Sequence, residues 1–156
     1  SLYAENDLRL DKYFAETDEK GFRKNKKAGS NNYLCTFRVG EIYLTAAEAA
    51  ARLGELSQAR TRLLELMRKR YAPEAYEAKS VVVNAMDKEA LVQEILDERA
   101  RELAFEGHRW FDLRRSTRPR LEKVLDGTRY VLEENDARYT LAIPKEAIEA
   151  NPGLLN

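Results

Sequence analysis

Two stretches of the chain repeat apolar side chains every three or four residues, the spacing that predicts helices. In the first, residues 38–70, the alanines between Ala46 and Ala51 are strong helix formers and small enough for close packing against a neighbouring helix. Gly54 predicts the end of this helix, because glycine readily adopts the positive φ of a helix C-cap. The apolar positions that follow are Leu56, Ala59, Leu63, Leu66 and Met67. We therefore expect a helical hairpin over 38–70.

The second stretch predicts one long helix over 87–115. Its apolar positions are Val92, Leu96, Leu103, Trp110 and Leu113. Asp87 is a good N-cap, and Pro119 prevents any continuation. At 1.5 Å per residue a continuous helix of this kind would be about 42 Å long. Because glycine favours helix ends and kinks, we expect a bend or a break near Gly107.

Charged residues share this apolar stripe, at Arg99 and Glu106. A buried charge without a partner costs several kcal/mol, so these groups need partners. Glu98 has Arg101 one turn away, and Glu106 has Arg109 at the same spacing. The segment therefore predicts an internal ion-pair network rather than a catalytic centre.

The segments on either side of the helical hairpin are less regular. Residues 1–37 are polar and lack a sustained period, which predicts an irregular arm with one short hairpin. Residues 71–86 contain Pro73 and are expected to form a connection, with an extended run at Val81–Val83.

The carboxy-terminal residues 129–156 predict a hairpin and a tail. Arg129–Val131 and Tyr139–Ile143 flank a turn-rich segment, Glu134–Asp136, and are interpreted as the two strands. A short helical turn over 145–150 is expected to follow.

Composition limits the classes of function. With 156 residues, 44% hydrophobic and 35% charged, the chain is typical of one globular, helix-rich domain. The 27 basic and 27 acidic residues cancel, which argues against nucleic acid as a partner. The sequence contains no run of 18 consecutive apolar residues, so no transmembrane helix is predicted. Cys35 is the single cysteine, which excludes an internal disulfide.

A metal centre is one candidate chemistry for the long helix. Glu98, Glu102 and Glu106 are spaced by four residues, and His108 lies close by. A helical di-metal site needs a Glu-x-x-His motif, however, and position 105 is Phe105. Since arginines compete for the same carboxylates, we predict structural ion pairs and no metal or other cofactor.

General base catalysis by His108 is the second candidate. Asp112 lies one helical turn after His108, where its carboxylate could orient the imidazole ring. Ser116 and Thr117 supply hydroxyls nearby. The chain lacks a glycine-rich nucleophile turn, so a hydrogen-bonded histidine at a helix junction is favoured. A hydrolase that uses Glu98 or Glu102 with His108 stays as a rival hypothesis.

Aromatic rings are the third candidate, because their faces pack well against the apolar faces of sugar rings. Trp110 and Phe111 fit this idea, but Trp110 falls on the apolar stripe and is expected to be core. Aromatics in the less regular segments are better candidates for stacking. These are Tyr3, Phe22, Tyr33, Tyr71 and Tyr76.

Several motifs occur in an order that resembles one family. Residues 97–115 read DERARELAFEGHRWFDLRR, and residues 38–49 read RVGEIYLTAAEA. Residues 139–144 read YTLAIP and are followed by Asn151 and Pro152, while a weaker match opens the chain at Asp7-Leu8-Arg9. Together these motifs resemble the SusD/RagB family of outer-membrane nutrient-binding lipoproteins, in its carboxy-terminal part.

The residues that carry the resemblance are interpreted as a structural signature. They are Glu41, Tyr43, Glu48, Gly54, Glu98, Arg99, Glu102, Glu106, Gly107, Arg109, Trp110, Asp112 and Arg114. The family pattern marks none of them as catalytic, cofactor-binding or metal-binding, and it leaves the ligand-contacting residues unknown. Because family members are far longer, we expect residues 1–156 to be a carboxy-terminal portion whose signal peptide and lipid anchor lie elsewhere.

The resemblance implies a mainly α fold with a tetratricopeptide-like helical pair, a long helix, irregular loops and a small β-hairpin. It implies a non-enzymatic protein that binds a glycan or related nutrient for a SusC-like TonB-dependent transporter at the cell outer membrane. The alternative is a tetratricopeptide-type protein-interaction scaffold, because one such repeat matches the chain. The matching positions are Tyr43, Ala47, Gly54, Ala59 and Leu63.

Overall fold

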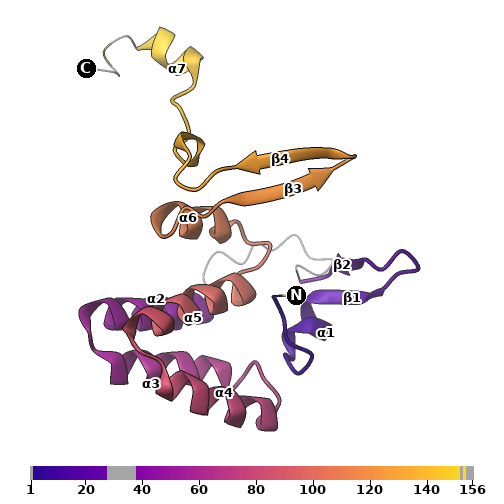
Figure 1. Cartoon of the computed structure of the whole chain (residues 1–156), viewed down its shortest axis with the longest axis vertical. Coiled ribbons are helices and arrows are strands. Elements are labelled where there is room, and N and C mark those ends of the chain that lie inside the picture. The colour runs from indigo at the N-terminus through magenta and orange to yellow at the C-terminus, as the bar shows by residue number, and fades with distance from the viewer. Residues whose placement is uncertain (1, 28–37, 152, 154–156) are drawn as a thin grey trace. The chain divides into compact units, whose positions relative to one another are not determined.

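The computed structural model describes residues 2–27, 38–151 and 153, and it divides the chain into two compact units, Ser1–Arg109 and Trp110–Asn156. The described part is mostly helical with two small antiparallel hairpins, which confirms the predicted mainly α class (Figure 1). Among these residues, no helix has the length and apolar character needed to cross a bilayer. Tyr33 and Cys35 lie outside the described residues.

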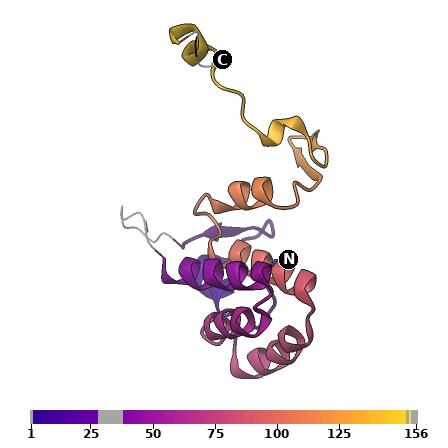
Figure 2. The same cartoon turned by 90° about the vertical axis from the view of Figure 1, so that its left-hand side faces the viewer.

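The first unit is built on a helical pair. Helix α2 (Val39–Leu53) and helix α3 (Leu56–Met67) are joined at Gly54, whose φ of 87° closes the C-cap as the sequence predicts. Figures 1 and 2 show α2 lying against both α3 and α5 (Lys88–Glu102), and these three helices enclose the core. Its fully buried side chains include Leu44, Ala47, Ala51, Ala59, Leu63, Met67, Leu91 and Ile95.

The segment predicted as a connection is instead a helix, α4 (Pro73–Ala85). Pro73 stands in its first turn, where a missing N–H costs nothing. Val83 is 2% exposed, whereas Val81 is 70% exposed. The helical period therefore turns one valine of the run to the core, and the predicted extended run was wrong because tertiary packing overrode β propensity.

The predicted long helix is two helices. Asp87 caps α5, its Oδ1 accepting a hydrogen bond of 2.8 Å from the Ala90 N–H. Helix α5 ends at Glu102, and α6 (His108–Arg115) begins after a turn in which Phe105 and Gly107 have φ of 66° and 83°. The break thus lies where Gly107 predicted it, and left-handed backbone cannot continue an α-helix.

This break corrects the apolar stripe drawn on one continuous helix. Leu103 is buried in the first unit, while Trp110 and Leu113 belong to the second. Trp110 is half-buried and stacks on the buried Tyr139, with ring centroids 5.2 Å apart and planes at 14°. Trp110 therefore packs locally against Tyr139. It does not share a continuous apolar stripe with Leu103, as the prediction of one long helix had assumed.

The amino-terminal arm contains helix α1 (Arg9–Tyr13) and a hairpin of strands β1 (Phe14–Thr17) and β2 (Arg23–Asn25). The short hairpin predicted for this arm is therefore present. The Leu8 N–H donates to the Arg70 carbonyl, and the Ala72 N–H donates to the Asn6 carbonyl. These bonds attach the arm to the chain that leads from α3 to α4.

The second unit carries strands β3 (Leu121–Leu125) and β4 (Thr128–Leu132), a 3-10 turn, η1 (Ala137–Tyr139), and helix α7 (Lys145–Ala150). The predicted hairpin was wrong, because β4 pairs with β3 and Tyr139 lies in η1. Asp126 and Gly127 form the turn with φ of 48° and 76°. An Asp-Gly pair with two positive φ values is the preferred two-residue hairpin turn, a stronger signal than Glu134–Asp136. The helical turn over 145–150 is present.

Candidate functional site

The inner face of α5 carries charge. Glu98 and Glu102 are one helical turn apart, and both are 0% exposed. Two carboxylates so placed repel each other and lose their hydration, so they persist only with cationic partners. The partners come from the arm, from the residue before α2, from the segment after α3 and from α5 itself. We call the two acids and these partners, Arg9, Arg38, Arg70 and Arg101, the Glu98–Glu102 cluster.

Arg9 lies between the two carboxylates. Its Nη1 is 2.8 Å from Glu98 Oε1 and 3.2 Å from Glu102 Oε2, the former an ion pair without hydrogen-bond alignment. Its Nη2 and Nε donate to Asp7 at 2.8 and 2.9 Å. Burial opposes the charge of Arg9, but the bonds to Asp7 and the charge of Glu98 outweigh it and raise the pKa of Arg9.

Arg70 binds Glu102 in the bidentate arrangement that suits a guanidinium and a carboxylate. Arg70 Nε and Nη2 donate to its two oxygens at 2.7 and 2.8 Å, and Arg38 Nη2 lies 3.4 Å away. Burial alone would raise the pKa of Glu102. The bonds from Arg70 and the charges of Arg70, Arg9 and Arg38 outweigh burial and lower that pKa.

Glu98 has partners on its other side. Arg101 Nε donates to Glu98 Oε2 at 2.8 Å, which confirms the predicted one-turn pair. The Tyr71 hydroxyl donates to the same oxygen at 3.1 Å, and Arg101 also reaches Glu94 at 2.6 Å. Burial is the main reason that the pKa of Tyr71 is raised, with the charge of Glu98 adding to it.

Glu106 pairs differently from the prediction. Its Oε1 contacts Lys27 Nζ and accepts a hydrogen bond of 2.7 Å from Arg38 Nη1, while Arg109 is exposed. Arg109 follows the left-handed turn at Gly107, so the one-turn spacing assumed for a continuous helix does not apply. The predicted Glu106–Arg109 pair was therefore wrong.

Lys27 closes the end of α5. Its Nζ donates to the carbonyls of Glu102 and Ala104 at 2.6 and 3.1 Å, which satisfies acceptors that a helix end leaves free. Burial lowers the pKa of Lys27 even though Glu106 opposes it. Lys27 thus attaches the amino-terminal arm to the end of α5.

His108 does not face the predicted orienting group. Its Nδ1 lies 3.5 Å from Glu41 Oε1, whereas Asp112 pairs with Arg115 Nη2 at 2.6 Å. Nothing in the described ranges brings three or more His, Cys, Asp or Glu side chains together as a metal ion would require. The described side-chain contacts of His108 and Asp112 are therefore with charged side chains, those of Glu41 and Arg115.

The other signature residues are placed along the same elements. Glu48 is buried and binds Arg52 Nε at 2.9 Å, while Arg99 donates to Thr45 at 3.1 Å. Tyr43 is half-buried against the core of the first unit. In the second unit the Arg114 carbonyl accepts a hydrogen bond from Arg118 Nε at 2.9 Å.

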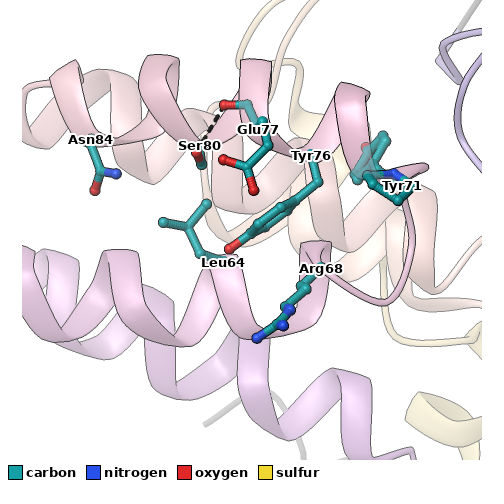
Figure 3. A pocket seen from close by; sticks show the side chains of 8 residues that line it. Leu64, Arg68, Tyr71, Tyr76, Glu77, Ser80 and Asn84 are labelled. Carbon is teal, nitrogen blue, oxygen red and sulfur yellow. Dashed lines mark hydrogen bonds between the residues drawn. The ribbon is translucent and has the colours of Figure 1, made fainter.

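A pocket of about 600 Å³ opens between α3 and α4. Figure 3 shows the Tyr76 ring lying across it, with the Tyr76 hydroxyl directed toward α3 and the Glu77 carboxylate on the same side of α4. Two predicted stacking aromatics therefore meet here. The lining residues are Leu64, Arg68, Tyr71, Pro73, Tyr76, Glu77, Ser80 and Asn84.

The remaining predicted stacking aromatics lie elsewhere. Tyr3 is buried and donates its hydroxyl to the Arg101 carbonyl at 2.7 Å. Phe22 is exposed beside the β1–β2 turn, and Phe111 is exposed on α6. None of these three lines the pocket between α3 and α4.

Comparison with known proteins settles the family. The model of the SusD family matches residues 3–156, nearly the whole chain. The chain belongs to the SusD family. No curated protein matches the chain closely enough to name as a relative.

Membership has general consequences. SusD proteins are non-catalytic binding proteins associated with carbohydrate or nutrient uptake, and in general they are surface lipoproteins of the outer membrane. The motif that carries the family resemblance, residues 97–115, supplies both central carboxylates of the Glu98–Glu102 cluster. In this SusD protein the motif is therefore tied to the packing of α5.

Sequence reasoning missed most cationic partners in this cluster. Arg9, Lys27, Arg38 and Arg70 all contact the α5 acids, yet each lies far from them in the chain. The family motifs gave the only signal, because Arg9 lies in the Asp7-Leu8-Arg9 match and Arg38 opens the match over 38–49. Lys27 and Arg70 lie outside these motifs, and their sequence pattern is that of ordinary surface cations.

Proposed function

We propose that this SusD protein captures an oligosaccharide or related nutrient at the outer-membrane surface and hands it to a SusC-like TonB-dependent transporter, without chemical turnover. The observation that carries the proposal is the pairing of the α5 carboxylates. Glu98 and Glu102, the acids of the rival hydrolase hypothesis, are 0% exposed and paired with arginines. An acid in this state neither reaches a substrate nor exchanges a proton with it.

Family membership supports the ligand class, because SusD proteins are associated with carbohydrate or nutrient binding. The open pocket between α3 and α4 supports it as well, since pockets of about 300–1,000 Å³ accommodate small ligands. The tetratricopeptide-type scaffold is kept as the alternative outcome of the test.

The test is calorimetric titration of the complete gene product with a panel of plant, host and microbial oligosaccharides. We expect at least one saccharide to bind with a measurable heat and to be recovered intact. Absence of heat with every saccharide, together with tight binding of a peptide, would overturn the proposal in favour of the scaffold.

The hydrolase rival has its own test. The bound saccharide is incubated with wild type and with Glu102→Gln, and the products are separated by chromatography. We expect no cleavage by either protein. Turnover by wild type that is lost in a folded Glu102→Gln variant would show that the protein is an enzyme.

A further inference from the structure

We propose that the pocket between α3 and α4 is a saccharide subsite, in which Tyr76 stacks on one face of a neutral pyranose ring. The inference rests on the proposed function and deepens it, because it places sugar contacts on this chain.

The aromatic wall has one ring suited to stacking. Tyr76 is half-buried against the core of the first unit, so packing fixes the ring while part of it faces the pocket (Figure 3). Tyr71 also lines the pocket but is only 3% exposed, and its hydroxyl is bonded to Glu98. Arg9 and Lys79 lie over its ring, 5.3 and 4.7 Å from the centroid. The Tyr71 ring is therefore already covered, and Tyr76 is the ring available to stack on a sugar face.

The polar wall comes from one face of α4. Glu77, Ser80 and Asn84 follow one another at spacings of three and four, so they line the pocket together. The Ser80 hydroxyl donates its proton to the Glu77 carbonyl at 2.8 Å. The lone pairs of Ser80 Oγ can therefore accept a hydrogen bond from a ligand. A carboxylate accepts, an amide both donates and accepts, and a guanidinium donates, which matches the alternating hydroxyl groups of a sugar.

The charge of the pocket favours a neutral sugar. Its lining holds one base, Arg68, and one acid, Glu77, and neither side chain has an ion-pair partner among residues 2–27, 38–151 and 153. The arginines around Glu98 and Glu102, by contrast, are occupied by those carboxylates. The pocket therefore offers both hydrogen-bond donors and acceptors. The charges of Arg68 and Glu77 cancel, so the lining has no net positive charge that would select an anionic sugar.

The experiment compares variants in binding to neutral hexasaccharides of glucose, xylose and mannose, with hexagalacturonate as the acidic probe. Tyr76→Ala is expected to weaken binding of the neutral probe by about ten-fold, since it removes the stacking ring, while Tyr76→Phe stays near wild type. Glu77→Ala and Asn84→Ala are expected to weaken the same binding. Glu74→Ala, on the same helix but outside the pocket, and Tyr130→Ala, an exposed tyrosine of β4, are the matched controls.

Because Tyr76 also contacts the core, thermal unfolding of each variant is measured. Glu77 and Asn84 are exposed, so their variants test the pocket even where Tyr76→Ala is unstable. Binding of a neutral saccharide that all three pocket variants leave unchanged would overturn the subsite while the proposed function stands. Binding of hexagalacturonate alone would overturn the neutral class, and binding of no saccharide would overturn both proposals.

Discussion

At Glu102 the two carboxylate oxygens are shared among Arg9, Arg70 and Arg38, at distances of 2.7 to 3.4 Å. The side chain is 0% exposed, so its hydration is fully replaced by guanidinium groups. Such a cluster is not a large net source of stability, because desolvation offsets most of the attraction. Its importance appears when one member is removed. Without the charge of Glu102, Arg70 keeps no acidic partner among the described residues, while Arg9 and Arg38 keep their pairs with Asp7, Glu98 and Glu106.

We predict that Glu102→Gln lowers the free energy of unfolding by about 3–5 kcal/mol, the usual cost of breaking a buried ion pair. The substitution keeps the shape but leaves Arg9 and Arg70 facing a neutral amide. Urea denaturation measures the loss. Glu65→Gln is the control, because Glu65 and Arg62 form a pair 46% exposed on each side and worth at most about 1 kcal/mol. Equal effects of the two variants would contradict the prediction.

A pH dependence follows from the same carboxylate. The arginines lower the pKa of Glu102 against the effect of burial, so this group favours the folded state while it is ionised. Its stabilisation is fully present above the ordinary glutamate value of about 4.3 and is lost as the pH falls through the lowered value. We expect the stability of wild type to fall more steeply in this acidic range than that of Glu102→Gln, as measured by urea denaturation at successive pH values. Parallel curves would contradict this assignment.

Between elements, α2 approaches the Glu102 side chain of α5 closely at Gly40. A Cβ added at Gly40 would lie 2.7 Å from Glu102 Oε1 and 3.1 Å from its Cγ. The end of a glutamate side chain usually moves aside at little cost. Here three arginines hold it, so Gly40 is needed for the helices to pack at this distance.

Gly40→Ala is therefore expected to destabilise the protein by about 1–3 kcal/mol through overpacking. This exceeds the gain of about 1 kcal/mol that alanine brings to a helix interior. Urea denaturation of Gly40→Ala in the wild-type and Glu102→Ala backgrounds separates the cost of overpacking from the gain in helix propensity. With the Glu102 side chain truncated, Gly40→Ala should become neutral or stabilising. Destabilisation of equal size in both backgrounds would exclude the contact as its cause.

Two turn-forming segments near the carboxy terminus show how local sequence signals for a hairpin compete. Asp126-Gly127 forms a two-residue turn, and five residue pairs from Leu121↔Leu132 to Leu125↔Thr128 follow from it. The segment Glu134–Asp136 is also rich in turn formers, but it leads into η1 rather than into a strand. The sequence contained the correct signal, and the stronger turn chemistry identifies it.

For the molecule as a whole, the division into Ser1–Arg109 and Trp110–Asn156 determines how far a local change is felt. The partners of Glu102 that hold its carboxylate all lie in the first unit. Stability in proteins is often partitioned among such cooperative units. A defect in the Glu98–Glu102 cluster is therefore expected to stay within the first unit.

Amide hydrogen exchange tests this expectation. Glu102→Gln should speed exchange in α2 and α5 and leave the paired amides of β3 and β4 unchanged. A destabilised hairpin variant, Gly127→Val, is the converse control, because a β-branched residue is strained at a φ of 76°. Faster exchange throughout both units in either variant would show that the chain unfolds as one unit.

Helix pairing, capping and the break at Gly107 were readable from the residues because each depends on neighbours a few positions away. Val81–Val83 defeated local reasoning, because packing of α4 rather than propensity decided its conformation. The partners of Glu102 lie 32 to 93 positions from it, and the pocket joins α3 to α4 across a turn. Proximity of that kind arises only when the chain has folded, since spacing along a sequence says nothing about which distant cation will meet a buried acid.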